Sequence, residues 1–261
     1  MTYIQIYLLS LVLIQVMMAL LWIVSVRLKN VSIVDPFWGL GFVVVSLFYF
    51  MQGPGFETRK ILIFSMVMIW GLRLSIYLFW RNAGKGEDFR YRQFRKDFGE
   101  KRYWWISYFQ VFVLQGFLMW LISAPLLAAQ FYGSEIQLRW LDFLGIFLWV
   151  VGFTFEAGGD FQLALFKSNP ENHGKVLNTG FWRYTRHPNY FGDAAAWWGY
   201  ACICMAAGSF LPVLGSLLMT ALIIKVSGVA LLEKTLNNTK PQYADYVKRT
   251  SAFLPWFPKK K

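Results

Sequence analysis

Long apolar segments follow one another along this sequence, and they constrain its fold more than any other feature. Several approach or exceed the roughly 20 residues with which an α-helix crosses the hydrocarbon core of a bilayer. Backbone groups have no water to bind there, so each such segment must be helical. The sequence therefore predicts an all-α polytopic membrane protein. We expect about seven transmembrane helices, at residues 4–26, 36–52, 60–80, 107–132, 139–166, 193–211 and 213–233.

The composition agrees with a membrane protein. Hydrophobic residues make up 57% of the 261 residues and charged residues only 15%, whereas a soluble domain carries about a quarter charged residues. No composition shift or internal repeat suggests a second domain, so we expect a single integral membrane domain over residues 1–261. The N-terminus has no charged region and no small-residue cleavage site ahead of its apolar run, which favours a retained first helix over a signal peptide.

The basic residues are distributed on one side of the expected membrane. With the N-terminus placed outside, the segments 27–35, 81–106, 167–192 and 234–261 lie inside and hold 21 of the 26 Lys and Arg residues. Cytoplasmic loops carry this excess in membrane proteins. The net charge of +12 is therefore explained by topology, without a nucleic-acid partner. We predict a cytoplasmic C-terminus, with the polar clusters gathered on the cytoplasmic side.

The two cysteines, Cys202 and Cys204, lie in one apolar segment. Residues two apart on a helix do not face each other. We therefore expect neither a disulfide nor a thiol metal site, and no metal is predicted.

Three ionisable residues end the fifth apolar segment. Glu156, Asp160 and Lys167 are spaced four and seven residues apart, so they share one helical face. Ionisable residues inside a membrane span are costly and often functional. The adjacent Gly158 and Gly159 would let another backbone or a ligand approach. An ion-paired helix end is the alternative, but a face turned to a cytoplasmic cavity is favoured.

Two candidates for catalysis come from the second and third segments. Tyr77 lies one turn from Arg73 and from Arg81. A neighbouring cation favours the phenolate, so Tyr77 is a candidate proton donor to an enolate; an interfacial aromatic with a polar tip is the alternative. Arg81 can also snorkel to the interface. Asp35 precedes Pro36, which favours a helix N-cap over a catalytic carboxylate.

The polar segment after the third span alternates basic and aromatic residues. Arg90 and Arg92 flank Tyr91, a pattern that suits a phosphate and a stacked ring. An amphipathic segment lying in the membrane interface is the alternative.

The stretch "GFWRYTRHPNYFGD" at residues 180–193 is the densest polar cluster in the sequence. Arg183, Arg186 and His187 fall within five residues, and Arg binds phosphate through two hydrogen bonds. The proline after His187 stops any helix upstream, so the next helix is expected to start near Asn189, with Asn189 as its cap. Its N–H groups and Asp193 would face a phosphorylated, hydroxyl-rich ligand. A clamp for a lipid headgroup is the alternative.

Three motifs together resemble a known superfamily. "TGFWRYTRHPNYFGDAAAWWG" is similar to the C-terminal signature of the steroid 5-alpha-reductase superfamily. "LLEKTLNNTKPQYADYVKRTSAFLPWFP" resembles its closing Glu–…–Tyr-x-x-Tyr–…–Pro pattern. In combination with "RNAGKGEDFRY", they resemble the bacterial DUF1295 branch. The superfamily contains NADPH-dependent reductases of steroids and sterols, and S-adenosylmethionine-dependent isoprenylcysteine carboxyl methyltransferases.

This resemblance implies a function and a site. The "NYxGD" pattern and the spacing of Asp160 and Lys167 resemble the reductases, so we expect an enzyme of the bacterial inner membrane that binds NADPH from the cytoplasm in its C-terminal half, residues 139–261. It would transfer hydride to an activated C=C of a lipid or steroid-like substrate. The predicted cofactor-binding residues are Glu156, Asp160, Lys167, Arg183, Arg186, His187, Asn189, Tyr190, Asp193, Tyr246, Arg81 and Arg90.

The catalytic candidates are Tyr77 and Asp35. The animal 5-alpha reductases carry a Gln-Glu pair on an early span, and only Asp35 occupies roughly that region here. A bacterial lipid enone or unsaturated acyl chain is therefore as plausible as a steroid. A methyltransferase acting on a lipid or prenyl thiol carboxylate, and a non-catalytic lipid-binding protein, are the alternatives. The oligomeric state stays open.

Overall fold

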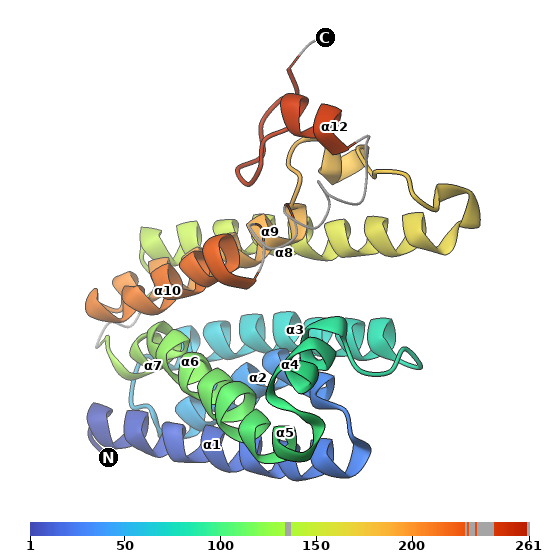
Figure 1. Cartoon of the computed structure of the whole chain (residues 1–261). Helices are drawn as coiled ribbons and strands as arrows, with labels where there is room; N and C mark the ends of the chain where they lie inside the picture. Colours follow the sequence, from blue (N-terminus) through green and yellow to red (C-terminus); the bar gives the residue numbers. More distant parts are fainter. Residues whose placement is uncertain (134–136, 228, 230–232, 234–242, 260–261) are drawn as a thin grey trace. The chain divides into compact units, whose positions relative to one another are not determined.

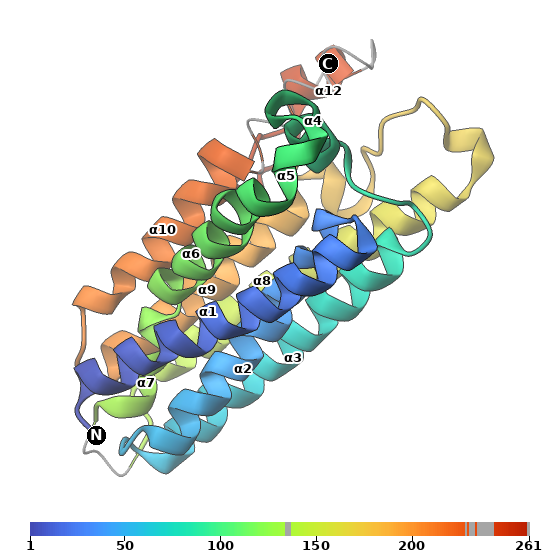
Figure 2. The same ribbon diagram turned by 60° about the horizontal axis from the view of Figure 1, so that its bottom comes forward.

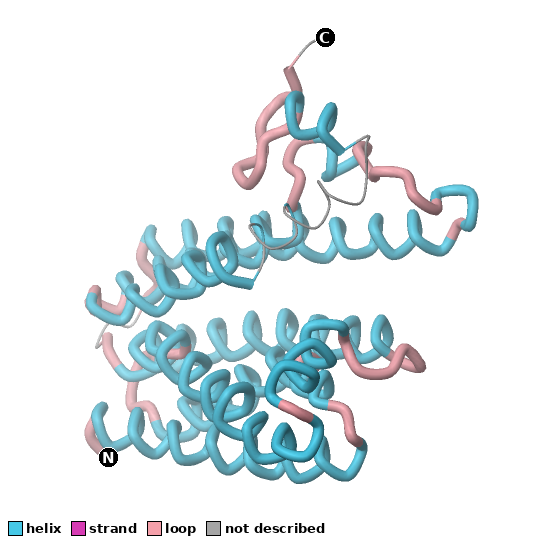
Figure 3. Tube along the Cα trace, in the orientation of Figure 1, coloured by secondary structure: helices cyan, strands magenta, loops and turns pink. Residues whose placement is uncertain are grey.

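The computed structural model describes residues 1–133, 137–227, 229, 233 and 243–259. Over these residues the chain is helical and contains no β-strand (Figure 3). The one extended pairing among them is an isolated parallel bridge between Thr185 and Ser251. The prediction of an all-α polytopic membrane protein is confirmed.

The chain divides into two compact units. The first unit comprises residues 1–138 and 207–212, and the second comprises residues 139–206 and 213–261. Each is described here by itself.

The first unit is a bundle in which α2 packs on α3 and α1 packs on α2 and α6 (Figures 1 and 2). Its elements are α1 Tyr3–Leu28, a 3-10 turn Val31–Val34, α2 Phe37–Gln52, α3 Glu57–Asn82, α4 Phe89–Phe98, α5 Glu100–Ser107, a π-helical segment Tyr108–Val113, α6 Leu114–Ile122 and α7 Ala124–Phe131.

Helix α1 shows how this bundle fits a membrane. Ile6, Ile14 and Met18 are fully or almost fully buried, whereas Leu8 and Leu20 are more than half exposed. The buried residues are four or eight apart and share one stripe of the helix. Apolar residues on the opposite face suit contact with lipid, since an exposed apolar surface of this extent is unfavourable in water.

Small residues let α2 and α3 approach closely. A Cβ atom at Gly39 would lie 2.2 Å from the backbone oxygen of Gly71, and one at Gly71 would lie 2.6 Å from that of Gly39. Such small residues at helix interfaces allow the backbones to pack tightly within a membrane.

The second unit is built on the long helix α8, which packs along α9 (Figure 1). Its elements are α8 Trp140–Ser168, 3-10 turns Pro170–Asn172 and Gly180–Arg183, α9 Pro188–Ala206, α10 Leu214–Leu222, a π-helical segment Ile223–Ser227 and α12 Tyr243–Arg249. A further 3-10 turn, Leu211–Val213, lies where the chain passes from the first unit to the second.

Glycines spaced seven residues apart hold α8 and α9 together. A Cβ atom at Gly145 would lie 2.7 Å from the oxygen of Gly199, and one at Gly152 would lie 2.5 Å from the oxygen of Gly192. Residue numbers rise along α8 as they fall along α9, so the two helices are antiparallel. This close contact fixes the faces that carry the ionisable residues described below.

Among the residues that the structure describes, five helical stretches are long and apolar enough to cross a membrane, and they correspond to the first five expected spans. They are Tyr3–Leu28, Val31–Gln52, Glu57–Asn82, Glu100–Phe131 and Trp140–Ser168. The fourth begins at Glu100 instead of 107, because α5 continues through the π-helical segment into α6.

The last two expected spans differ from the structure. The helix expected at 193–211 is α9, Pro188–Ala206. It starts earlier because Pro188 has a backbone angle suited to a first helical turn, and it ends before Gly208, whose φ is +85°. The segment expected at 213–233 overlaps a shorter apolar helix, Leu211–Val226; residues 228 and 230–232 lie outside the described residues. Seven spans and a cytoplasmic C-terminus stay predictions.

Candidate functional site

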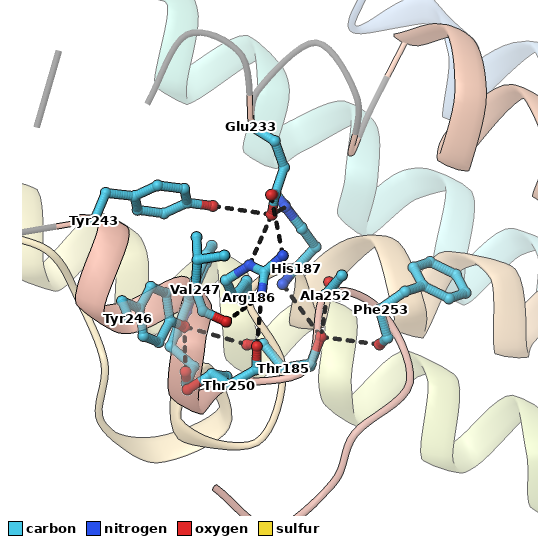
Figure 4. Close-up of polar contacts among 11 residues, drawn as sticks. Thr185, Arg186, His187, Glu233, Tyr243, Tyr246, Val247, Thr250, Ala252 and Phe253 are labelled. Atoms are coloured by element: carbon cyan, nitrogen blue, oxygen red, sulfur yellow. Dashed lines mark hydrogen bonds and ion pairs between the residues drawn. The ribbon is translucent and has the colours of Figure 1, made fainter. Parts of the chain in front are cut away.

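Arg186 lies at the centre of a polar cluster in the second unit (Figure 4). Its Nε and Nη2 donate to the two carboxylate oxygens of Glu233, at 2.7 and 3.0 Å. Its Nη1 donates to the backbone oxygens of Thr250, at 2.5 Å, and Val247, at 3.2 Å. The side chain of Arg186 is only 8% exposed. All three guanidinium nitrogens therefore donate to oxygen atoms of the protein. In this way Arg186 connects the start of α9 to the C-terminal segment.

The charges of this pair are mutually stabilised. Burial lowers the pKa of the Arg186 guanidinium, but the hydrogen bonds and charge of Glu233 outweigh it and raise the pKa above its ordinary value. Burial raises the pKa of Glu233, but the hydrogen bonds from Arg186 and His187 outweigh it and lower the pKa. Both groups are ionised at neutral pH, which is the arrangement of a charge-assisted, two-bond ion pair.

His187 extends the cluster. Its Nε2 lies 3.1 Å from Oε1 of Glu233, and its ring stacks on Tyr190 with centroids 5.8 Å apart. Only 2% of the side chain is exposed, and burial lowers the pKa of His187 despite the opposing effect of Glu233. Because the Glu233 carboxylate can only accept, Nε2 carries the proton of the neutral ring.

Two tyrosines of α12 complete the cluster. Tyr243 Oη donates to Oε1 of Glu233 at 3.1 Å, while Tyr246 Oη donates to the backbone oxygen of Trp182. Burial is the main cause that raises the pKa of both phenols. Tyr243 and Tyr246 are therefore hydrogen-bond donors at neutral pH.

Backbone contacts reinforce this junction (Figure 4). The Arg186 N–H donates to the oxygen of Ser251 at 2.9 Å, and Thr185 Oγ1 donates to the oxygen of Phe253 at 2.9 Å. The structure thus brings together three predicted cofactor residues. Arg186 and His187 share Glu233 as a partner, and Tyr246 contacts the backbone just before them. Their contacts hold the chain's C-terminal segment against residues 182–187.

A second group of polar residues lies between α8 and α9. Asn189 Nδ2 donates to Oδ1 of Asp160 at 3.1 Å. Glu156 and Asp160 are 3% and 5% exposed. Asp193 follows Asn189 by one turn of α9 and is half-buried. The structure therefore joins two predicted cofactor residues, Asp160 and Asn189, in a direct contact.

The glycine pair beside these residues behaves as expected. A Cβ atom at Gly159 would lie 3.2 Å from the backbone nitrogen of Asn189, and one at Gly158 would lie 2.3 Å from the Phe181 ring. The indole of Trp182 donates to the backbone oxygen of Gly159 at 3.1 Å. Of the predicted approach of another backbone or a ligand, the first is confirmed at Gly159, whereas Gly158 makes room for an aromatic side chain.

The predicted cap of α9 is wrong. The helix begins at Pro188, so Asn189 lies inside its first turn. Its side chain donates to Asp160 instead of accepting from the helix. Proline fixes the helix start one residue earlier, and the Asn189 side chain is thereby released for a contact between helices.

Three other predicted residues lie at the edge of this unit. Lys167, in the last turn of α8, and Arg183, in a 3-10 turn, are both exposed. Tyr190 is half-buried against His187. Lys167 therefore differs from Glu156 and Asp160, which are buried on the side of α8 that faces α9.

The first unit contains its own polar cluster, centred on Asp35. Arg90 Nη2 donates to Oδ2 of Asp35 at 2.9 Å, and Tyr91 Oη donates to Oδ1 at 2.7 Å. Gln115 Nε2 lies 3.4 Å from Tyr91 Oη, and the Trp38 indole donates to Gln115 Oε1 at 2.6 Å. The carboxylate thus receives a cation and a phenol, while a chain of side-chain contacts supports the phenol.

This cluster corrects two interpretations of the sequence. The side chain of Asp35 does not cap α2, because its oxygens accept from Arg90 and Tyr91; the cap position is taken by Pro36 without a side-chain bond. Tyr91 is 4% exposed, so its buried ring is unsuited to stack on a ligand from solvent. Burial, followed by the charge of Asp35, raises the pKa of Tyr91.

The sequence spacing around Tyr77 is reproduced in α3. The guanidinium carbons of Arg73 and Arg81 lie 5.5 and 5.7 Å from the centroid of the Tyr77 ring. Arg81 is exposed, and its Nε donates to Asn82 at 3.3 Å. Tyr77 is therefore held between two cations, which the proton-donor interpretation requires and the interfacial-aromatic interpretation allows.

Sequence reasoning assigned no role to Glu233 or Tyr243 and a different role to Tyr91. Glu233 and Tyr243 belong to the closing motif, of which only Tyr246 was assigned a role. Tyr91 was expected to stack instead of bonding to Asp35. The motif was the available signal for Glu233, since it contains the acidic residue that a buried arginine needs as partner.

The chain is similar to known sequences over most of its length. It matches the family described as "Protein of unknown function (DUF1295)" over residues 21–250. The chain belongs to the DUF1295 family. An uncharacterized protein of Schizosaccharomyces pombe is 27% identical over 201 residues, which cover 68% of this chain and 58% of the yeast protein. No solved structure matches the sequence.

This DUF1295 membership confirms the branch predicted from the motifs, whereas the link to the steroid 5-alpha-reductase superfamily stays a prediction. Within the described part of this DUF1295 chain, no group of three or more His, Cys, Asp or Glu residues has the arrangement of a metal site. The two cysteines, Cys202 and Cys204, are both buried, and neither is part of a disulfide.

Proposed function

We propose that this DUF1295 protein is an NADPH-dependent membrane reductase that adds hydrogen across an activated C=C of a lipid or steroid-like substrate. One observation carries this proposal: Tyr91 and Arg90 meet on the carboxylate of Asp35, at 2.7 and 2.9 Å. A buried phenol held in one orientation by charged neighbours is a preorganised donor for a substrate carbonyl. Polarising that carbonyl makes the β carbon of an enone accept hydride.

The protonation states suit this role. The raised pKa of Tyr91 keeps its hydroxyl protonated at neutral pH. Arg90 balances the charge of Asp35, with which it forms an ion pair at 2.9 Å. A substrate oxygen entering the cluster takes the hydrogen bond that Tyr91 now gives to Asp35. Gln115 and Trp38 restrict the movement of the phenol, so little reorganisation accompanies the reaction.

The residues of the second unit suit the cofactor in part. Asp160, Asn189 and Asp193 provide acceptors and a donor for ribose hydroxyls or a carboxamide. Arg183 and Lys167 provide positive charge for phosphates. When bound, NADPH supplies the hydride.

The three predicted cofactor residues that lie in the Arg186 cluster take a different role in this proposal. Arg186, His187 and Tyr246 hold the loop that carries Arg183 and position it. They are positioning residues, because their polar atoms already contact protein groups.

Tyr77 is proposed as the donor of the proton that completes the reduction. It would protonate the carbon next to the carbonyl once the enolate has formed. Arg73 and Arg81 flank its ring, and two guanidinium groups stabilise the negative charge that a phenol acquires as it loses its proton. The substrate would enter from the bilayer, and the site would face the cytoplasm of a bacterial inner membrane.

Cofactor binding can be tested on the protein purified in detergent. A ligand that binds the folded state raises the melting temperature by mass action. We expect NADPH to raise it and S-adenosylmethionine to leave it unchanged. The opposite result would favour a methyltransferase, and no response to either compound would favour a non-catalytic lipid-binding protein.

Hydride transfer needs a separate test. Membranes containing the protein are incubated with NADPH deuterated at its transferable hydrogen, and their lipids are analysed by mass spectrometry. We expect one deuterium in a reduced lipid, and none with Asp35→Asn. An Arg92→Gln variant, altered at an exposed residue next to Tyr91, is the control and should retain the label.

A further inference from the structure

A cavity of about 500 Å³ lies in the first unit, and its lining does not include the residues of the Asp35 cluster. It is bounded by the end of α1, the 3-10 turn after it, the end of α4 and the length of α5. Its lining includes Lys29, Arg95, Glu100, Tyr103 and Trp104.

The cavity has an unsatisfied donor in its wall. Tyr103 is fully buried, and its Oη has no hydrogen-bond partner among the described residues. Buried polar atoms of folded proteins nearly always have a partner. An oxygen of a ligand in the cavity would supply one.

Charges of both signs line the same cavity. Lys29 and Glu100 are exposed, and neither forms an ion pair with any part of the chain that the structure describes. Arg95, in contrast, forms two hydrogen bonds to Glu87, at 2.8 and 3.1 Å, and its guanidinium lies 5.0 Å from the Tyr103 ring centroid. Glu100 acts on Arg95 through its charge alone, so Lys29 and Glu100 can each form a hydrogen-bonded ion pair with a ligand.

The position of the cavity points to a lipid. It lies where α1, a predicted membrane span, ends in Arg27 and Lys29. Trp104 is half-exposed at its rim, and the indole of Trp22 donates to the Trp104 backbone oxygen at 2.8 Å. Tryptophan and basic residues mark the level of the headgroups in a bilayer.

We propose that this cavity binds the phosphoethanolamine headgroup of a membrane phospholipid. The phosphate accepts from Lys29 and from the Tyr103 hydroxyl, and the ammonium donates to Glu100 beside the face of Trp104. A headgroup with only a negative charge would leave Glu100 without a partner and place it near a like charge. The site is independent of the proposed reductase activity.

The headgroup can be identified by adding lipids to the delipidated protein in detergent. Dioleoyl phosphatidylethanolamine, phosphatidylglycerol and phosphatidylcholine are compared by thermal shift and by native mass spectrometry. We expect the ethanolamine lipid to raise the melting temperature most and to stay bound in the mass spectrum. An equal or larger response to phosphatidylglycerol would overturn the proposal, as would equal responses to all three lipids.

Variants of the cavity make the test specific. Lys29→Gln, Glu100→Gln and Tyr103→Phe each remove one proposed contact and keep the size of the side chain. Each should weaken phosphatidylethanolamine binding, about tenfold for the two charged contacts. Lys101→Gln, at an exposed residue that does not line the cavity, should bind as the unaltered protein does. Unchanged affinity in all three cavity variants would overturn the proposal even if lipid stays bound.

Discussion

Arg186 and Glu233 form a two-bond ion pair across 47 positions of sequence, at 2.7 and 3.0 Å. The pair joins the residue two positions before α9 to an acidic residue near the C-terminal segment. The same guanidinium group also donates to the backbone oxygens of Val247 and Thr250. One guanidinium group therefore holds Glu233, Val247 and Thr250 together.

Replacing that guanidinium should loosen the C-terminal segment. Arg186→Lys keeps the charge but loses the planar fork that reaches Glu233 and two carbonyls at once. We expect a loss of about 1–3 kcal/mol in stability, because lysine leaves buried acceptors without a donor, while its charge still balances that of Glu233, which is 20% exposed. Limited proteolysis should then cleave within residues 243–259 at lower protease concentration. The matched variant Arg183→Lys, altered at an exposed arginine, should be cleaved like the unaltered protein.

The His187–Glu233 contact should make stability depend on pH. The pKa of His187 is lowered from 6.5 by burial, so the unfolded chain binds a proton at a higher pH than the folded chain does. The neutral ring therefore contributes stability that is present above pH 6.5 and is lost as the pH falls below it. The pKa of Glu233 is also lowered, from 4.5, and its contribution is lost on further acidification.

Melting temperatures measured in detergent between pH 8 and pH 5 test this dependence. We expect the melting temperature to fall below about pH 6.5. The free energy of unfolding should decrease by at most about 1.4 kcal/mol per pH unit for the single histidine. His187→Gln should reduce the slope in this range. His173→Gln, which alters the other, exposed histidine, should retain it. An identical slope in both variants would assign the decline to other groups.

Apolar pattern predicted the fold better than local polar chemistry predicted the contacts. The first five spans follow from runs of apolar residues, since burial in lipid and internal backbone hydrogen bonds admit only helices. The contacts of Asp35 and Glu233 do not follow, because their partners are 55 and 47 residues away. The sequence pattern predicts helix caps at Asp35 and Asn189. In the structure both side chains instead bind residues far away in sequence, Tyr91 and Asp160.

The α8–α9 contact should tolerate no added side chain at Gly192. A Cβ atom there would lie 2.4 Å from the backbone nitrogen of Glu156 and from the oxygen of Gly152. Because both obstacles are backbone atoms, Gly192→Ala must separate the helices, at a cost of about 1–3 kcal/mol or more. Gly116→Ala is the matched control, since its Cβ would meet the movable end of Gln15 at 2.9 Å. Melting temperatures in detergent should fall clearly for the first variant and little for the second.

The Asp160–Asn189 contact predicts which variants lose NADPH. Asn189→Ala and Asp193→Ala should each weaken NADPH binding while expression and detergent stability stay largely intact. Removing a hydrogen bond to a polar ligand costs about 1 kcal/mol, so a loss of about fivefold or more in affinity is expected for each. Thr154→Ala, altered at an exposed position of α8, should bind normally. Affinity is measured by titration of the purified protein, and unchanged values in both variants would remove the proposed cofactor site.

Two tyrosine variants separate proton donation from carbonyl polarisation. Tyr77→Phe keeps the ring between Arg73 and Arg81 but deletes the proposed acid. General acid catalysis contributes about 10²–10⁴-fold, so turnover should fall within that range. NADPH affinity should stay nearly constant, because the hydroxyl of Tyr77 is not proposed to contact the cofactor.

Tyr91→Phe deletes a different function, since its hydroxyl donates to Asp35 at 2.7 Å. If Tyr91 polarises the carbonyl, turnover should fall by about 10²–10³-fold, the loss seen on removing one oxyanion donor.

The two variants should differ in the step that they slow. Single-turnover oxidation of NADPH should be slowed by Tyr91→Phe, whereas Tyr77→Phe should leave oxidation less affected and accumulate the enolate ahead of protonation. Full turnover in Tyr77→Phe would reject it as the acid and favour an interfacial aromatic, whose hydroxyl meets only water or headgroups. Full turnover in Tyr91→Phe would remove the observation on which the reductase proposal rests.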